Sequence, residues 1–366
     1  MPSPPPTARP TATRPAQAAP SPSPSPTPWP TPTPAETRIP RPSAAYWPPP
    51  RHEYQRWNNC APATLSMALA FWGWEGDQGV LAPLLKPNPR DKNVTPEEIE
   101  AVVLHHTRYM MLWRPAGDLD VLRDFIVAGL PVMIETGFEP DDVEGWMGHY
   151  QLVWGYNDAK SMFYTHDSYQ GPEQAVPYDH LESTWRAFNF VLLAVYPIER
   201  DAQVRRILGQ RADPLAAYHA AAQRAERETQ TLTGRPQVFA WFNLGESLVG
   251  LGDFARAAQA YDRAFAGMAA LPPERRPWRW MWYHDGPYRA YYEEGRYHDV
   301  VQLATTTLTT MSEAVLEEAF YWRGRAYAAL GDLNAARADF QRALRVHPGY
   351  EPALRALQAL DAGESP

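Results

Sequence analysis

The first 50 residues of this 366-residue chain are dominated by proline, which fixes a backbone torsion angle and removes a hydrogen-bond donor. Of the 39 prolines in the chain, 19 fall in this segment, and in residues 21–28 and 31–34 they alternate with serine or threonine. Such a sequence has few apolar side chains to bury and favours extended polyproline II. We therefore expect residues 1–50 to be a stiff, disordered linker.

This linker also bears on where the protein works. Stalks rich in proline, serine and threonine commonly hold a domain away from a cell surface or envelope, so we expect an extracellular or envelope-associated protein. A cytoplasmic location is the alternative, because Met1 is followed directly by proline, without the charged and apolar regions of a signal peptide. The chain has no apolar run of about 18 residues, so no transmembrane segment is expected.

The net charge and the number of cysteines limit which partners and sites the protein can have. The net charge is −8 and no basic patch stands out, which argues against a nucleic-acid partner, because phosphate binding needs clustered Lys and Arg. The single cysteine, Cys60, excludes an intramolecular disulfide, and no cysteine cluster predicts a zinc site. We expect neither a metal nor a cofactor.

Residues 51–200 mix helical and extended patterns, which predicts an α+β domain. Asn59 is suited to cap the first helix, and a capping box that begins at Thr95 starts the second. Gly129 stops the third helix, and residues 157–160 form a hairpin turn between two strands. The first and third helices are expected over residues 61–73 and 120–128, and strands over residues 130–135, 150–156, 161–165 and 191–196.

Cys60 is the first candidate for chemistry. A lone cysteine is ordinarily a small buried hydrophobe. Cys60, however, stands at the start of a helix, where the helix dipole and the free N–H groups favour thiolate over thiol. Gln55 lies five residues upstream, and its side-chain amide could join the Cys60 backbone N–H in an oxyanion hole.

His149 and Asp167 complete the candidate site. His149 is predicted at the start of one strand and Asp167 at the end of the next, across a short hairpin turn. That arrangement places Asp167 near His149, where it could fix the tautomer of the imidazole. Taken singly, each of these side chains is more often structural. Their order along the chain indicates an activated thiol nucleophile, in which a base and an orienting group serve the cysteine.

At these residues the sequence resembles the bacteriocin-processing (C39-like) peptidases of the papain-like superfamily. The resemblance covers residues 51–198 and rests on three segments: 55–63, 148–150 and 166–168. It implies Cys60 as nucleophile, His149 as base, Asp167 as orienting residue and Gln55 as oxyanion donor. Two positions depart from the family pattern: Ala61 stands where glycine is usual, and Ser168 where proline is usual.

Residues 213–362 show internal repeats. Two copies, near residues 242–264 and 322–348, resemble the tetratricopeptide repeat at most signature positions, and a weaker copy near residues 288–300 lies between them. The pattern predicts an all-α domain whose concave groove binds peptides or proteins, or a purely structural extension of the first domain. The tryptophan-rich segment 278–283 is attributed to core packing. The charged segment 199–213 is predicted to be a connecting helix or a linker, at a boundary that makes the two domains separable.

The sequence thus predicts a papain-like α+β peptidase domain over residues 51–200 and a tetratricopeptide-repeat domain over residues 213–362. The expected function is a cysteine peptidase whose repeats bind or position a peptide or protein substrate. The alternative is a catalytically inactive papain-like fold that serves as a protein–protein interaction module.

Overall fold

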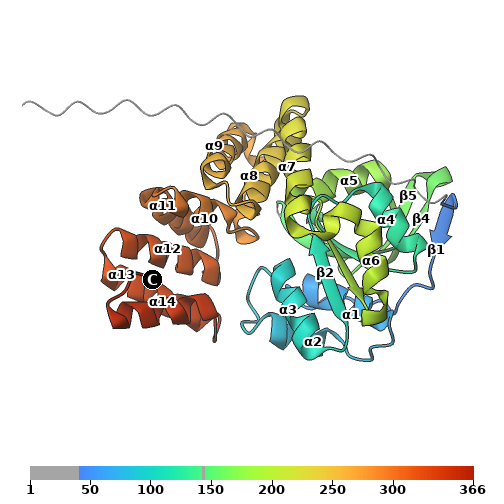
Figure 1. Cartoon of the computed structure of the whole chain (residues 1–366), viewed down its shortest axis with the longest axis horizontal. Helices are drawn as coiled ribbons and strands as arrows, with labels where there is room; N and C mark the ends of the chain where they lie inside the picture. The colour runs from blue at the N-terminus through green and yellow to red at the C-terminus, as the bar shows by residue number, and fades with distance from the viewer. Residues whose placement is uncertain (1–40, 142–144) are drawn as a thin grey trace, which may run out of the picture. The chain divides into compact units, whose positions relative to one another are not determined.

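The computed structural model describes residues 41–141 and 145–366. Most of the linker expected over residues 1–50 therefore lies outside the described residues. The rest divides into a sheet with flanking helices, followed by a run of paired helices, and both belong to one compact unit. Figure 1 shows the first part in blue to green and the second in yellow to red.

The first part is built on a seven-stranded antiparallel sheet with the order β2-β7-β3-β4-β5-β6, in which β1 also pairs with β4. The expected strands at 130–135, 150–156, 161–165 and 191–196 correspond to β3, β4, β5 and β7. The strands are β1 Ala44–Tyr46, β2 Met110–Arg114, β3 Val132–Phe138, β4 Met147–Asn157, β5 Met162–Asp167, β6 Gly171–Pro177 and β7 Leu192–Tyr196.

Helices cover both faces of this sheet, and side chains of β3 alternate between them. Met133 joins the apolar core under one group of helices, whereas Val132 and Ile134 join the core under the other. This period of two is the expected signature of a strand buried on both faces. The first group is α1 Cys60–Ala70, α2 Gln78–Leu85 and α3 Pro96–His106, and the second is α4 Leu119–Val127, α5 Tyr178–Trp185 and α6 Asp201–Leu208.

The predicted starts and ends of the helices are present, except for the predicted cap of the first helix. The capping box at Thr95 is present, and Gly129 ends α4 with φ +76°. Asn59 stands at the N-cap of α1, but its side chain makes no capping hydrogen bond there. It donates instead to Oε1 of the buried Gln78 at 3.1 Å, so a tertiary contact replaces the predicted local one.

The structured part begins before residue 50. Ala44–Tyr46 forms β1, and Arg41 binds Asp120 at 2.6 Å. The three residues of β1 lie between Pro42 and Pro48, so their N–H groups are available for sheet pairing. The sequence analysis placed residues 41–50 in the linker, whereas the structure places Ala44–Tyr46 in the sheet.

The charged segment 199–213 is helical, as one of the two predictions had it, but it is packed into the first part of the protein. It contains α6, whose Val204 and Leu208 are buried in the same core as α4. Its charged side chains lie on the outer face of an amphipathic helix, which is why composition alone suggested a linker.

The second part consists of antiparallel helix pairs with small residues at the crossings. A Cβ atom on Gly245 would lie 2.5 Å from the ring of Tyr261, and one on Gly324 would lie 2.7 Å from the ring of Phe340. The predicted Gly-Asp turns are present: Gly252 and Gly331 have positive φ, and the following aspartates cap α9 and α13. The helices are α7 Pro214–Thr231, α8 Gly234–Gly250, α9 Phe254–Ala270, α10 Gly286–Glu293, α11 Tyr297–Thr309, α12 Glu317–Ala329, α13 Leu333–Val346 and α14 Glu351–Ala362.

Candidate active site

Cys60 is the first residue of α1, and α1 is fixed against β4. The hydroxyl of Thr64, one turn into the helix, donates to the backbone carbonyl of Tyr150 at 3.1 Å. Residues 61–69 of α1 are buried, but Cys60 itself is partly exposed. The start of the helix is therefore held next to the strand that carries His149.

His149 and Asp167 are joined as the sequence predicted. The Nε2 atom of His149 lies 2.9 Å from Oδ1 of Asp167, and both side chains are almost fully buried. The same carboxylate oxygen accepts hydrogen bonds from the backbone N–H groups of Tyr169 at 2.7 Å and Gln170 at 2.8 Å. Burial disfavours the Asp167 carboxylate, but the charge and hydrogen bond of His149 keep its pKa below the usual value.

The imidazole of His149 lies close enough to Cys60 to influence the thiol, and because Nε2 of the ring is engaged by Asp167, Nδ1 is the atom left for the sulfur. Burial disfavours the Cys60 thiolate, but the neighbouring His149 outweighs burial, so the pKa of Cys60 is lowered. Burial likewise disfavours the imidazolium, but Asp167 and then Cys60 raise the pKa of His149 to about 10. Both shifts favour the thiolate–imidazolium form of the pair over the neutral form.

Gln55 is hydrogen-bonded to Ser168. Its backbone N–H donates to the Ser168 carbonyl at 2.8 Å, and its Oε1 accepts from the Ser168 hydroxyl at 2.9 Å. Among the described residues, no hydrogen bond between Gln55 and Cys60 is present. Because the amide oxygen is held by Ser168, the NH₂ end is the part of the side chain left to donate. Proline, the residue expected here from the resemblance, has no hydroxyl to make this contact.

Two buried charged residues near Cys60 were missed by the sequence analysis. Lys86 donates from Nζ to the carbonyl of Asn58 at 2.6 Å, and Asn58 has φ +52° in the turn before the helix. Burial lowers the pKa of Lys86, against the charges of Asp91 and Cys60. Glu135, opposite Tyr150 on β3, is also buried, and burial raises its pKa well above the usual value. Neither residue lies in a motif, so only the tertiary structure reveals it.

A segment between the first two helix pairs of the second part reaches the same strand. The side chain of Tyr283 packs against Gly148, where an added Cβ would lie 2.9 Å from its ring, and Arg279 donates to the carbonyl of Trp146 at 3.2 Å. Phe138 stacks on the imidazole of His149, with ring centres 4.5 Å apart. Segment 278–283 was predicted to serve core packing alone. It also lies next to His149 and forms part of its surroundings.

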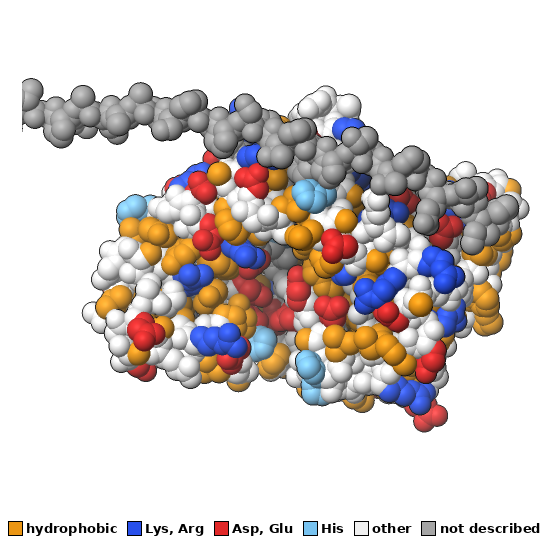
Figure 2. All heavy atoms as spheres, in the orientation of Figure 1, with side chains coloured by type: hydrophobic (Ala, Val, Ile, Leu, Met, Phe, Trp, Pro, Cys, Tyr) orange, Lys and Arg blue, Asp and Glu red, His pale blue; other side chains and the backbone are white. Residues whose placement is uncertain are grey.

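A separate hollow lies along the repeats. Figure 2 shows acidic side chains gathered around a depression on this face. A cavity of about 380 Å³ is bordered by α3, α8, α10 and α12, and none of its lining residues belongs to the Cys60–His149–Asp167 group. Burial raises the pKa of its Glu97 to about 7 and that of its Glu246 to about 8. Arg289 and Arg325 line the same cavity, so its lining carries charges of both signs.

Comparison with known proteins identifies both parts. Residues 48–193 match the Peptidase_C39 like family. We call this part of the chain the C39-like domain, because it matches that family model. Residues 240–266 and 317–350 of the second part each match a tetratricopeptide repeat family, so two of the three predicted repeats are confirmed.

One solved structure similar to the C39-like domain is a Bacillus anthracis protein assigned as a C39-like peptidase. It is 14% identical, with a TM-score of 0.35, and the match covers 42% of this chain and 96% of that chain. No curated protein matches the sequence. Among the residues that the structure describes, no helix combines the length and apolar character needed to cross a membrane.

Proposed function

We propose that the C39-like domain is a cysteine peptidase in which Cys60 is the nucleophile, His149 the proton carrier and Asp167 the orienting group. The observation that supports this most directly is the buried hydrogen bond between His149 and Asp167, with Cys60 close enough to the same imidazole for its pKa to be lowered. These groups have the form of an activated thiol nucleophile with an oriented base. Their buried position at the junction of α1, β4 and β5 holds them in one geometry.

The reaction follows from these positions. The Cys60 thiolate attacks the peptide carbonyl carbon, and the imidazolium of His149 gives its proton to the departing amine nitrogen. Water then attacks the thioester, and His149 takes a proton from that water. The Cys60 thiolate is the leaving group, and the carboxylic acid product is released. The Cys60 N–H and the amide of Gln55 are the proposed donors to the carbonyl oxygen in both steps.

The tetratricopeptide repeats are proposed to bind and position the peptide or protein substrate. Segment 278–283 supports this role, because Tyr283 and Arg279 contact the strand that carries His149. The acidic cavity beside α3 suits a segment that carries Lys or Arg. A substrate held there remains attached to the same rigid unit as the catalytic residues.

The test uses the fact that Cys60 is the only thiol in the chain. Iodoacetamide should label the native protein at mildly acidic pH much faster than it labels the His149→Ala variant, because His149 lowers the pKa of Cys60. Hydrolysis of a peptide library by the native protein, with Cys60→Ala as control, tests the activity itself. Slow labelling together with no hydrolysis would instead support an inactive fold that acts as an interaction module.

A further inference from the structure

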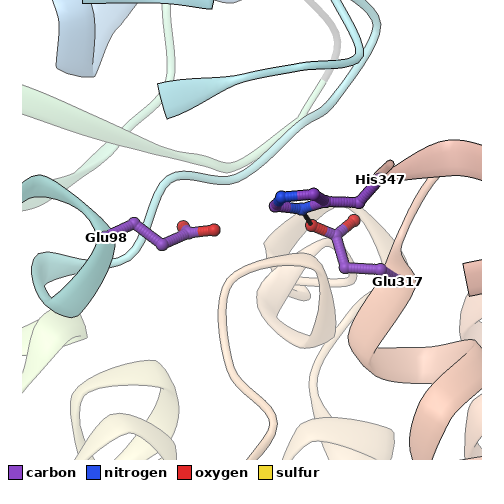
Figure 3. A group of neighbouring side chains, drawn as sticks. All are labelled: Glu98, Glu317 and His347. Carbon is purple, nitrogen blue, oxygen red and sulfur yellow. Dashed lines mark hydrogen bonds and ion pairs between the residues drawn. The ribbon is translucent and has the colours of Figure 1, made fainter. Parts of the chain in front are cut away.

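Three side chains from distant parts of the chain converge where the C39-like domain meets the third repeat. Glu98 belongs to α3, Glu317 is the first residue of α12, and His347 follows α13. One ligand atom from each lies within 4.8 Å of the other two. Figure 3 shows the carboxylate of Glu98 pointing toward the His347 ring from the side opposite to Glu317.

We propose that Glu98, Glu317 and His347 bind one divalent transition-metal ion, with Zn²⁺ the best-suited ion, and that this ion fixes the third repeat to the C39-like domain. One imidazole and two carboxylates are a donor set typical of zinc, with a fourth position left for water. Calcium and magnesium prefer sites made of oxygen atoms alone.

The side chains are already oriented by their neighbours. The Oε2 atom of Glu98 accepts hydrogen bonds from the backbone N–H and the hydroxyl of Thr95, at 2.8 and 3.1 Å, which leaves Oε1 for a ligand. The Nδ1 atom of His347 is paired with Oε1 of Glu317. Contacts that orient a metal ligand from behind, as Thr95 does here, are a regular part of metal sites.

The balance of charge favours a cation at this place. Glu317 is only 2% exposed, and among the described residues neither Glu98 nor Glu317 forms an ion pair with Lys or Arg. Two carboxylates this close repel each other in a buried setting, and a single histidine offsets only one of them.

The distances fit after the ligand atoms move toward one another. Zinc binds nitrogen and oxygen at about 2.1 Å in tetrahedral geometry, so two ligand atoms on one ion lie about 3.4 Å apart. A separation of up to 4.8 Å must therefore close by up to roughly 1.4 Å. Glu98 is only partly buried and has three rotatable side-chain bonds, so its carboxylate is the one free to move.

The experiment uses the full-length chain carrying Cys60→Ala, so that the thiol and His149 cannot bind the metal together. Zinc bound after equilibrium dialysis is measured by mass spectrometry, and thermal unfolding is followed with and without zinc. We expect one zinc ion per chain and a rise in Tm of about 5 °C at saturation. His347→Ala and Glu317→Gln should each weaken zinc binding by about 100-fold or more.

A matched control is His298→Ala, which removes an exposed histidine from the neighbouring α11 and should leave zinc binding unchanged. Glu98→Gln provides a variant at a partly buried site, in case Glu317→Gln does not fold. The proposal is wrong if the parent chain binds no zinc, or if these ligand variants bind as much as the control. If His347→Ala loses the same amount of stability in the presence of zinc as in the presence of a chelator, His347 only forms an ion pair with Glu317. That result would also contradict the proposal.

Discussion

The C39-like domain and the repeat region solve the problem of positioning side chains in different ways. In the C39-like domain, Cys60, His149 and Asp167 are brought together by a sheet whose neighbouring strands are often far apart in sequence. In the repeat region, Gly324 meets Phe340 within one helix pair. The sheet of the C39-like domain can hold a network of polar side chains in a buried place. In the repeat region, the stability of each repeat depends on its neighbours. Substitutions in the two regions should therefore have different consequences.

Cys60→Ala should give the largest effect, which should be a loss of catalysis without a loss of stability. The side chain is small and begins α1 without contributing to its buried face, so the thermal unfolding temperature should hardly change. Turnover of any peptide substrate should fall by at least about 10⁴-fold, because the nucleophile is gone. Hydrolysis retained in this variant would contradict the assignment of the nucleophile.

Asp167→Ala should reduce kcat by about 10- to 10⁴-fold, since Asp167 orients the imidazole without carrying the proton. The measurement is steady-state hydrolysis of the best library peptide. An unaltered rate would exclude Asp167 as the orienting residue.

The pH profile of the same variant gives a second measurement. The active pair forms as pH rises through the lowered pKa of Cys60, and it is lost as pH rises through the pKa of His149, at about 10. Because Asp167 is the largest influence that raises the pKa of His149, its loss should move the alkaline limb of kcat/KM to lower pH. A merely structural role for Asp167 would leave the position of that limb unchanged.

Removing the repeats tests whether the two regions are independent. The sequence predicts that residues 45–200 form a separable domain, but that cut would divide β1 and remove α6, which is part of the core. A chain of residues 41–212 keeps both elements. It should retain rapid labelling of Cys60, and it should be less stable because Phe188 and Trp146 lose their contacts with Tyr283. Loss of labelling in this shorter chain, with labelling kept in the full chain, would show that the repeats are part of the enzyme.

Gly324→Ala should affect stability without affecting chemistry. The new Cβ would lie 2.7 Å from the Phe340 ring, so the third repeat must shift at a cost of about 1–3 kcal/mol. Chemical denaturation measures this change, and iodoacetamide labelling of Cys60 should proceed at the parental rate. A changed labelling rate would show that the two regions are more closely coupled than their packing suggests.

Ser168→Ala should give the smallest effect. It removes the hydroxyl that holds Oε1 of Gln55, so the amide should become less well oriented. We expect kcat to fall by about 2- to 10-fold, which corresponds to one lost hydrogen bond. Gln55→Ala in the same assay sets the upper limit, and a double variant that loses more than Gln55→Ala alone would separate the two roles.

The sequence predicted most of the elements because their signals are local. The capping box at Thr95, the hairpin turn after β4 and the Gly-Asp turns of the repeats each depend on a few neighbouring residues. The pairing of His149 with Asp167 was also predictable, since one hairpin separates them.

What the sequence could not predict depends on tertiary contacts. The side chain of Asn59 turns to Gln78 in α2, Lys86 supports the turn before Cys60, and Tyr283 reaches Gly148 from the repeats. The convergence of Glu98 with Glu317 and His347 is of the same kind. None of these contacts has a periodic pattern or a short motif, because each joins segments that only the folded chain brings together.

The single cysteine has a consequence for oxidation. A partly exposed thiol with a lowered pKa reacts readily with peroxide and forms a sulfenic acid. In most redox-controlled proteins a second cysteine captures that species as a disulfide and protects it from further oxidation. Here the chain carries no other sulfur nucleophile, so an oxidised Cys60 can be restored only by thiols from its surroundings. Whether the protein remains competent is thus set by the reducing capacity of the compartment in which it is found.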